Sequence, residues 1–230
     1  LNLRTRRTPL DETVLGLLPE SMKRHVLAFR PEGAVDVGVD YEKADADEPA
    51  DYEISVACLG NRIDHERFPY PLHNVRGTVT LDVNAVTLHD IEAVPALQSD
   101  PSLAPSVHVD GRLSLTGENH GQGAFTVRAH DILFTRELGE SLPKSLRGIY
   151  RDSAPRGPFD LDIETLEVSG TDHKLIRLGG RMDLKTCSLE VSGAGTEVCG
   201  RLDVAAAYDT RSGLSTGQMH LAADRLNIKA

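Results

Sequence analysis

The sequence repeats one short pattern: a glycine, any residue, an apolar residue, any residue and a second apolar residue. It occurs eight times, as GAVDV at 33, GTVTL at 77, GRLSL at 111, GAFTV at 123, GPFDL at 157, GRMDL at 180, GRLDV at 200 and GQMHL at 217. Alternation of this kind gives a strand one apolar and one polar face, and glycine adopts the turn or bulge conformations that precede such a strand. The pattern therefore predicts an all-β chain of short strands, each with one apolar side.

A longer repeat underlies the short one. When the sequence is displaced by 124 positions, its start aligns with its middle without a gap. The aligned pairs include Leu1 with Phe125, Arg4 with Arg128, Pro19 with Pro143, Pro31 with Pro155, Gly33 with Gly157 and Asp36 with Asp160. We expect two copies of one β-rich unit, residues 1–124 and an incomplete second copy at 125–230, within one continuous structural domain.

Each copy is expected to pass from a strand into short helices. Thr8 and Pro9, followed by Asp11 and Glu12, predict a helix start with a capping residue, a first-position proline and an acidic first turn. Apolar stripes follow in both copies: Met22, Val26 and Phe29 in the first, Leu146, Ile149 and Tyr150 in the second. We expect these stripes to cover an end or edge of the sheet, with binding of a partner as the alternative. FPYPL, at residues 68–72, predicts a turn that leads into the next strand.

Charge and composition exclude several classes of protein. The net charge is −10 and the basic residues are scattered, so we expect no nucleic-acid partner. The most apolar run, residues 14–18, is far shorter than the roughly 18 residues of a membrane-spanning helix. Because the chain begins with Leu1, we expect it to be a fragment of a longer protein, so it carries no information on a signal peptide.

Residues that perform chemistry are few and dispersed. The nine histidines form neither a His-Glu-x-x-His pair nor a Cys/His zinc spacing, and we expect no serine nucleophile, metal or cofactor. Asp160, Asp162 and Glu164 share the polar side of one predicted strand, where solvated carboxylates are the usual case. Cys187 and Cys199 could pair across a hairpin, although three free thiols are the favoured interpretation. The chain is therefore predicted not to be an enzyme.

The order of these segments resembles a known family. A Leu-Pro helix precedes RPEGAVDV in the first copy and APRGPFDL in the second, and FPYPLHNVRGTVTLDVNAVTLHDI and VHVDGRLSL follow the first. This arrangement is similar to the AsmA-like branch of the bacterial AsmA/TamB/YhdP group, which is related in architecture to bridge-like lipid-transfer proteins. The second copy lacks an FPYPL segment and has HKLIRLGGRMDL in its place.

The resemblance implies an elongated, twisted antiparallel sheet that is folded lengthwise into an open apolar groove, a β-taco. It also implies a periplasmic segment of a longer protein, anchored in the inner membrane by parts outside this chain, that conducts phospholipid toward the outer membrane. Strand parity selects the residues expected to line the groove: Val35, Val37, Val39, Val79, Leu81, Val83, Leu113, Leu115, Phe125, Val127, Phe159, Leu161 and Ile163. Such a groove needs continuous apolar surface and no catalytic group.

The same alternation is also compatible with apolar faces that pack on each other. A closed β-sandwich or a β-solenoid would then form a structural or adhesin-like module of a large cell-envelope protein. The recurring Leu-Pro helix and the irregular strand spacing favour the groove. A carbohydrate-active enzyme is the third alternative, but only 4% of the residues are aromatic and tryptophan is absent.

Overall fold

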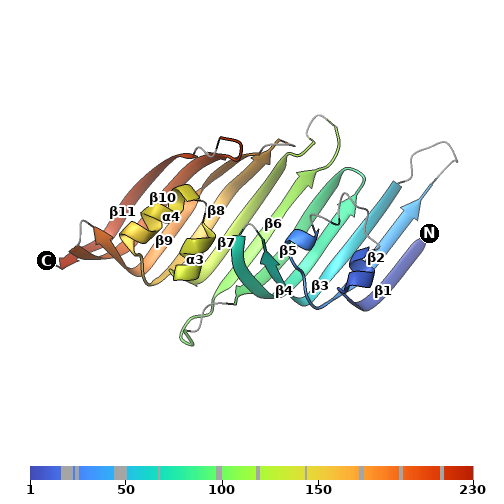
Figure 1. Cartoon of the computed structure of the whole chain (residues 1–230), viewed down its shortest axis with the longest axis horizontal. Helices are drawn as coiled ribbons and strands as arrows, with labels where there is room; N and C mark the ends of the chain where they lie inside the picture. Colours follow the sequence, from blue (N-terminus) through green and yellow to red (C-terminus); the bar gives the residue numbers. More distant parts are fainter. Residues whose placement is uncertain are drawn as a thin grey trace.

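The chain forms one open sheet of eleven strands in a computed structural model (Figure 1). The structure describes residues 1–16, 23, 26–43, 51–66, 68–96, 100–117, 120–142, 144–170, 174–191, 194–212 and 215–229. The strands are β1 (Asn2–Pro9), β2 (Ala34–Glu42), β3 (Asp51–His65), β4 (Phe68–Asp82), β5 (Ala85–Pro95), β6 (Ser106–Ser114), β7 (Gly123–Leu133), β8 (Pro158–Ser169), β9 (Leu175–Val191), β10 (Ala194–Asp209) and β11 (Ser215–Lys229).

Every strand pairs antiparallel with the strands before and after it in the sequence, so the order in the sheet is the order in the chain. β1 and β11 are the two edges. The prediction of an all-β fold with short helices and an antiparallel sheet is confirmed. All strands of the described residues belong to this one sheet, which differs from the two facing sheets of the sandwich alternative and from the coils of a solenoid.

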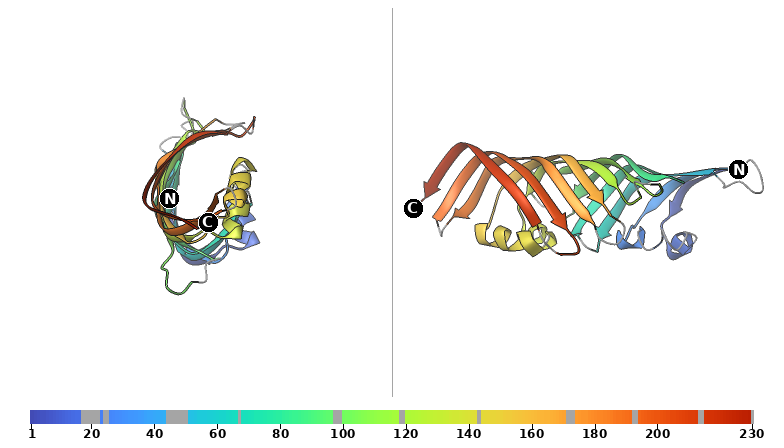
Figure 2. Two further views of the ribbon diagram at one scale, coloured as in Figure 1. Left: turned by 90° about the vertical axis from the view of Figure 1, so that its left-hand side faces the viewer. Right: turned by 90° about the horizontal axis from the view of Figure 1, so that it is seen from above.

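Seen along its long axis, the sheet is curved into a C (Figure 2). Three helices, α1 (Glu12–Gly16), α3 (Arg136–Ser141) and α4 (Lys144–Ser153), lie on the open, concave side. Each of α1 and α3 directly follows a strand, β1 and β7 respectively. The molecule is therefore a twisted, curved sheet with a few short helices on one side of it.

Two details of the helices differ from the sequence-based expectations. Pro9 ends β1 rather than opening a helix, and Asp11 caps α1 by accepting a hydrogen bond from the Val14 N–H at 3.0 Å. In α4, Leu146 and Ile149 are exposed, so only Tyr150 of that predicted stripe packs inward, against Phe134. Of the stripe in the first copy, Met22 lies outside the described residues.

The FPYPL segment was predicted as a turn and is instead the first part of β4. The pairing of β3 with β4 shifts register between Ile63 and His65, so the ladder is interrupted beside Pro69 and Pro71, which have no N–H to donate. Tyr70, between the two prolines, is buried. The Ser141 hydroxyl at the end of α3 donates to the Pro69 carbonyl at 3.0 Å, which ties that helix to β4.

The repeated glycines have two different roles. Those at 33, 123 and 157 stand at or directly before the start of a strand, whereas those at 77, 111, 180 and 200 lie inside strands. At Gly77, φ is +115°, and an added Cβ would overlap the backbone carbonyl of Asp90 on β5. This glycine therefore permits a bulge within β4 rather than marking where the strand begins.

The three cysteines are free thiols. Cys187 aligns with Val198 across the β9–β10 pair rather than with Cys199. Cys187 is buried, while Cys58 and Cys199 are half-buried.

Candidate functional site: the concave apolar face

Strand register gathers the apolar side chains on one side of the sheet. Residues that are opposite each other in an antiparallel pair point to the same side, so the pairing can be followed from strand to strand. One such row runs from β2 to β11 through Val37, Val56, Val79, Leu88, Gly111, Phe125, Leu166, Leu178, Ala206 and Gly217. We call this the open row, because its side chains are half-buried or exposed.

A second apolar row runs beside the open row, two residues further along β4. It passes from β1 to β10 through Leu3, Val39, Ile54, Leu81, Val86, Leu113, Gly123, Val168, Ile176 and Tyr208. Leu3 on the edge strand is 52% exposed, whereas Leu81 in the interior of the sheet is 5% exposed. The apolar face is thus continuous across almost the whole sheet and is most open at its edges.

Of the thirteen residues predicted to line a groove, eleven lie in strands, and register places all eleven on this face. Val83 and Leu115 lie just beyond the ends of β4 and β6. The Leu115 N–H donates to the Asn84 carbonyl at 2.6 Å, in the segment between β4 and β5. Strand parity thus selected one face correctly but extended two strands too far.

Part of the same face was not predicted from the sequence. Val56, Leu88, Leu166 and Leu178 complete the open row but do not follow a glycine in the repeated pattern. The alternation in ISVACL at 54–59 and VTL at 86–88 was a usable signal for β3 and β5.

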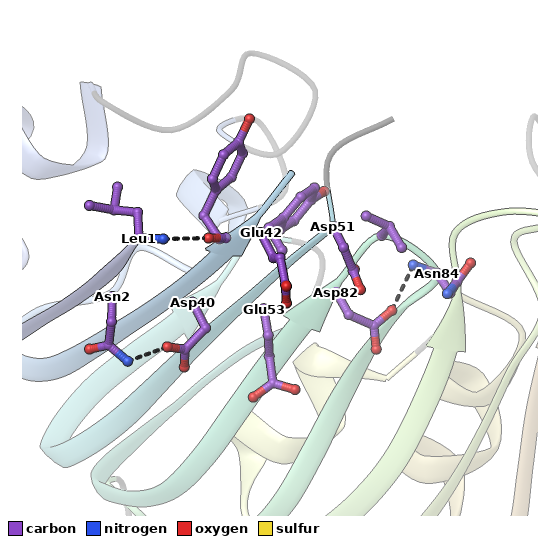
Figure 3. Close-up of a pocket in the computed structure, with 11 residues that line it drawn as sticks. Leu1, Asn2, Asp40, Glu42, Asp51, Glu53, Asp82 and Asn84 are labelled. Atoms are coloured by element: carbon purple, nitrogen blue, oxygen red, sulfur yellow. Dashed lines mark hydrogen bonds between the residues drawn. The ribbon is translucent and has the colours of Figure 1, made fainter. Parts of the chain in front are cut away.

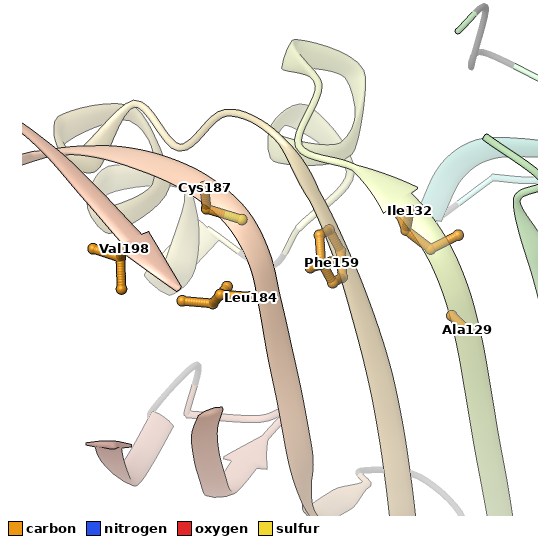
Figure 4. Packing of buried hydrophobic residues seen from close by; sticks show 6 residues of the cluster. All are labelled: Ala129, Ile132, Phe159, Leu184, Cys187 and Val198. Carbon is orange, nitrogen blue, oxygen red and sulfur yellow. The ribbon is translucent and has the colours of Figure 1, made fainter. Parts of the chain in front are cut away.

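One end of the apolar face is covered. Ala129, Ile132, Phe159, Leu184, Cys187 and Val198, on β7 to β10, form a buried cluster, which we call the covered end (Figure 4). Leu138 of α3 and Phe134 pack against it, and the Phe134 ring stacks on Phe159 with centroids 4.3 Å apart. Since α3 lies on the concave side, the apolar face is the concave one.

Two glycines leave room for the Phe125 ring to lie flat on the apolar face. An added Cβ at Gly111 or Gly123 would overlap the Phe125 ring, so that ring lies against the backbone of β6 and the start of β7. A large side chain that lies flat adds apolar area without height. The space above the open row is therefore not filled by the ring of Phe125.

The convex face carries ion pairs instead. Arg181 on β9 contacts Asp162 on β8 at 2.9 Å, Arg201 on β10 contacts Asp183 on β9 at 3.1 Å, and Arg4 contacts Asp40 at 2.6 Å. These groups are partly exposed, so each pair contributes at most about 1 kcal/mol. The two faces of the sheet thus differ sharply in chemistry: one is ionic and hydrated, the other apolar.

Three bulges in the sheet are each capped by an aspartate on the convex face of the neighbouring strand. Arg7, Asp90 and Asp131 have φ values of 51°, 48° and 53°, and each stands where the pairing with the next strand shifts register. Their N–H groups donate to Asp36, Asp110 and Asp160 on the neighbouring strand at 2.7, 2.8 and 2.8 Å. A carboxylate in each of these positions thus accepts the N–H of the residue at the bulge.

The electrostatics of two of these aspartates follow from the bulges. The hydrogen bond from the Asp90 N–H lowers the pKa of Asp110, and His108 adds to the effect. Partial burial acts to raise the pKa of Asp160, but hydrogen bonds from Lys185 and from the Asp131 N–H outweigh it, so the pKa is lowered. Asp160 is one of the three carboxylates that share the polar side of β8, and it forms an ion pair with Lys185 at 2.8 Å.

Asp90, His108 and Asp110 place potential metal-ligand atoms within 4.8 Å of one another. His108 contacts Asp110 at 2.6 Å, and Asp110 also accepts the bulge hydrogen bond. The same bulge cap occurs at Arg7, where Asp36 accepts the N–H, and at Asp131, where His130 likewise lies 3.7 Å from the capping carboxylate of Asp160. The group at Asp90 is therefore one of three bulge caps, and the structural role of Asp110 accounts for it.

One serine motif was passed over when no serine nucleophile was expected. GLSTG at 213–217 matches the Gly-x-Ser-x-Gly pattern of a nucleophile elbow, which needs a strand, a sharp turn and then a helix. Ser215 begins β11 instead, aligned with Tyr208 of β10. Ser215 therefore lies at the start of a hairpin strand and not between a strand and a helix.

An acidic pocket of about 640 Å³ lies at the β1 edge (Figure 3). Asp40, Glu42, Asp51, Glu53 and Asp82 line it. The terminal ammonium of Leu1 donates to the Tyr41 carbonyl at 2.6 Å, and Asn2 binds Asp40. The pocket therefore presents negative charge near the β1 edge.

Comparisons with protein-family models, curated proteins and solved structures give no match for this chain. Among the described helices, none is both long and apolar enough to cross a bilayer.

Proposed function

We propose that the concave apolar face shields the acyl chains of phospholipids and that the chain is a non-enzymatic segment of a lipid-conducting protein. The observation that supports this is the open row: apolar side chains continue across ten strands without a second sheet over them in the described residues. Exposed apolar surface of this extent is costly in water, and it commonly marks an interaction site. An acyl chain would contribute about 0.8 kcal/mol for each methylene that it buries there.

The shape of the ligand follows from the shape of the face. The open row runs across the strands along the long axis of the sheet, and the C-shaped curvature surrounds that axis on one side. An extended hydrocarbon chain could lie along the row, with its polar end in water. Proteins that transfer lipid in this way need no catalytic group, which fits the structural roles of Asp110 and Asp160.

We also infer that the sheet consists of two copies of one unit, residues 1–124 and 125–230. Several backbone details recur at a spacing of 124 residues. Positive φ values occur at Arg7 and Asp131, at Arg30 and Ala154, and at Gly33 and Gly157. The Leu10 N–H donates to the Gly33 carbonyl at 2.9 Å, and the Phe134 N–H donates to the Gly157 carbonyl at 3.1 Å. In such an array, each added unit would lengthen the apolar face by several strands.

The cellular setting remains as the resemblance implies it. We propose that this segment lies in the periplasm, that other parts of the longer protein anchor it in the inner membrane, and that phospholipid and the rest of the same chain are its partners. A net charge of −10 and the ion pairs on the convex face are compatible with an aqueous environment.

Native mass spectrometry of the purified protein, with extraction and identification of bound lipid, tests the proposal. Val79→Asp places a charge in the middle of the open row, and Thr80→Asp places the same charge on the opposite face of the same strand. We expect stoichiometric phospholipid in the parent and in Thr80→Asp, and its loss in Val79→Asp with an unchanged circular dichroism spectrum.

The opposite result has a clear meaning. A lipid-free parent protein that forms dimers, and that Val79→Asp converts to monomers, would show that two apolar faces cover each other. The structural module would then be the correct interpretation.

A further inference from the structure

A second pocket, of about 660 Å³, lies beside α3 and α4 and carries the opposite charge from the pocket at the β1 edge. Four arginines line it: Arg136, Arg147, Arg151 and Arg156. With Glu140 as the one acid among the lining residues, the lining has a net formal charge of +3, in a chain whose net charge is −10. Guanidinium groups that share a pocket repel one another, and a bound anion removes that cost.

The chain itself neutralises only part of this charge. Arg136 pairs with Glu140 at 2.6 Å, and Arg151 contacts the exposed carboxylate of Asp152 at 3.4 Å. Arg147 donates to the Leu142 carbonyl at 2.7 Å, which holds its side chain against the start of α4. Backbone hydrogen bonds to Ser188 fix Arg156, whose guanidinium has no hydrogen bond or ion pair to another described residue. Arg147 and Arg156 therefore remain without a carboxylate partner among the described residues.

The fold does not require these arginines. The residues 124 positions earlier are Glu12, Lys23, Leu27 and Glu32, so the first copy has two acids and one base where the second has four bases. The framework is kept, because Leu10 corresponds to Phe134 and Pro31 to Pro155. The positive charge therefore distinguishes the second copy and is not a by-product of its backbone.

The pocket adjoins the apolar face. Phe134 lines the pocket and stacks on Phe159 of the covered end at 4.3 Å. Tyr150, another lining residue, has its hydroxyl fixed by donation to the Thr135 carbonyl at 2.7 Å. An anion in the pocket would thus lie next to the rings of Phe134 and Tyr150, and Phe134 also contacts the covered end of the apolar face.

From this charge, its absence in the first copy and its position, we propose that the pocket beside α3 and α4 binds a phosphate group. Guanidinium groups bind phosphate with two parallel charge-assisted hydrogen bonds each, which suits this ligand better than a halide or other small spherical anion. The phosphate can come from the headgroup of a phospholipid or from a free phosphate ion. The headgroup source rests on the proposed function, whereas the free-ion source does not.

Isothermal titration calorimetry with two probes separates these sources: inorganic phosphate, and dihexanoylphosphatidylglycerol below its micelle concentration. The test variant is Arg151→Gln/Arg156→Gln, because the Arg151 guanidinium contacts the exposed carboxylate of the adjacent Asp152 and Arg156 is fixed through its backbone, so both substitutions should leave α3 and α4 folded. Arg177→Gln on β9, an exposed arginine outside the pocket, is the matched control. We expect binding to the parent and the control, and binding at least about tenfold weaker to the double variant, since each charge-assisted hydrogen bond contributes that much or more.

Each outcome decides a separate point. If both probes bind and both weaken in the double variant, the pocket is a phosphate site for either source. If only the lipid binds and weakens, the site is a headgroup site that depends on the acyl chains. If the lipid binds equally to parent and double variant, or if neither probe binds the parent, the phosphate pocket is refuted. Val79→Asp is the second control, because a phosphate pocket that stands alone keeps its affinity for inorganic phosphate even if the apolar face binds no lipid.

Discussion

The covered end and the open row are two parts of the same apolar face, on the same strands, in different surroundings. At the covered end, Phe159 is 3% exposed and is packed by Phe134 and α3. A few residues along β8, Leu166 faces the same side and is only half-buried. The difference arises from the helices, which cover one end of the strands and, within the described part of the chain, leave the rest of the concave side uncovered.

Under the proposed function, stability and ligand binding are divided along one strand. The covered end has the dense packing of a core and contributes most to the free energy of unfolding. The side chains of the open row are less buried and contribute less to the free energy of unfolding, and under the proposed function they contact the ligand. If the account is right, substitutions at the two places have opposite consequences: loss of fold at the covered end, and loss of ligand at the open row.

The largest expected effect on stability is at Phe159. Phe159→Ala removes a fully buried ring and leaves a cavity between Ile132 and Leu184, which we expect to lower the free energy of unfolding by about 3–4 kcal/mol. Leu166→Ala on the same strand should cost only about 1 kcal/mol, because its side chain is half-buried. Urea unfolding followed by circular dichroism measures both. Equal losses would mean that the open row is part of the core.

The thiol at the covered end should be protected. Burial is the main cause that raises the pKa of Cys187 to about 11, from an ordinary value of 9.0. In a Cys58→Ser/Cys199→Ser background, we expect Cys187 at pH 8 to react with a disulfide reagent about a hundredfold more slowly in the folded than in the urea-unfolded protein. A similar rate in both states would show that the covered end opens readily.

Removal of a bulge cap on the convex face should have a smaller effect. Asp160→Asn weakens the hydrogen bond to the Asp131 N–H and removes the ion pair with Lys185, at an expected cost of about 1–2 kcal/mol at pH 7. The pKa of Asp160 is lowered by folding, so its contribution to stability is present above the usual carboxyl pKa near 3.8 and is lost as the pH falls through the lower folded value.

The pH dependence of unfolding checks that sign. The difference between the parent and Asp160→Asn should shrink below pH 4, whereas Glu164→Gln, an exposed carboxylate on the same strand, should change stability by less than about 0.5 kcal/mol throughout. A difference that grows as the pH falls would contradict the proposed role of Asp160.

The smallest effect is expected on the outer side of α4. Ile149 is 57% exposed, so Ile149→Ser should change the midpoint of urea unfolding by no more than an equivalent of about 0.5 kcal/mol. A loss comparable to that of Phe159→Ala would mean that α4 is packed on both sides.

The sequence was informative where one physical rule dominates. Alternation determines which side of a strand is apolar, so the prediction placed Val37, Val79 and Phe125 on one face. The 124-residue offset also located the helices that follow β1 and β7. Both signals are local in the chain or depend on its self-similarity, and neither needs knowledge of tertiary contacts.

Other features depend on contacts between strands and could not be obtained in that way. Gly77 and Gly200 were expected to open strands, but they lie within β4 and β10, where the backbone of the next strand comes too close for a side chain. The aspartates that close bulges looked like ordinary polar-face residues, because their partners are N–H groups on other strands. The arginine pocket combines residues from two helices and the segment after them, so no single stretch of sequence marks it.

The most direct test of the central claim is photocrosslinking with a phospholipid that carries a diazirine in its acyl chain. Peptide mass spectrometry then identifies the labelled residues in the purified, folded protein. The account predicts labels on the open row, on β4, β7, β8 and β9 together, at positions such as Val79, Phe125, Leu166 and Leu178. Labels on the convex side, at Thr80 or Arg177, or no labels above those of the unfolded protein, would contradict it.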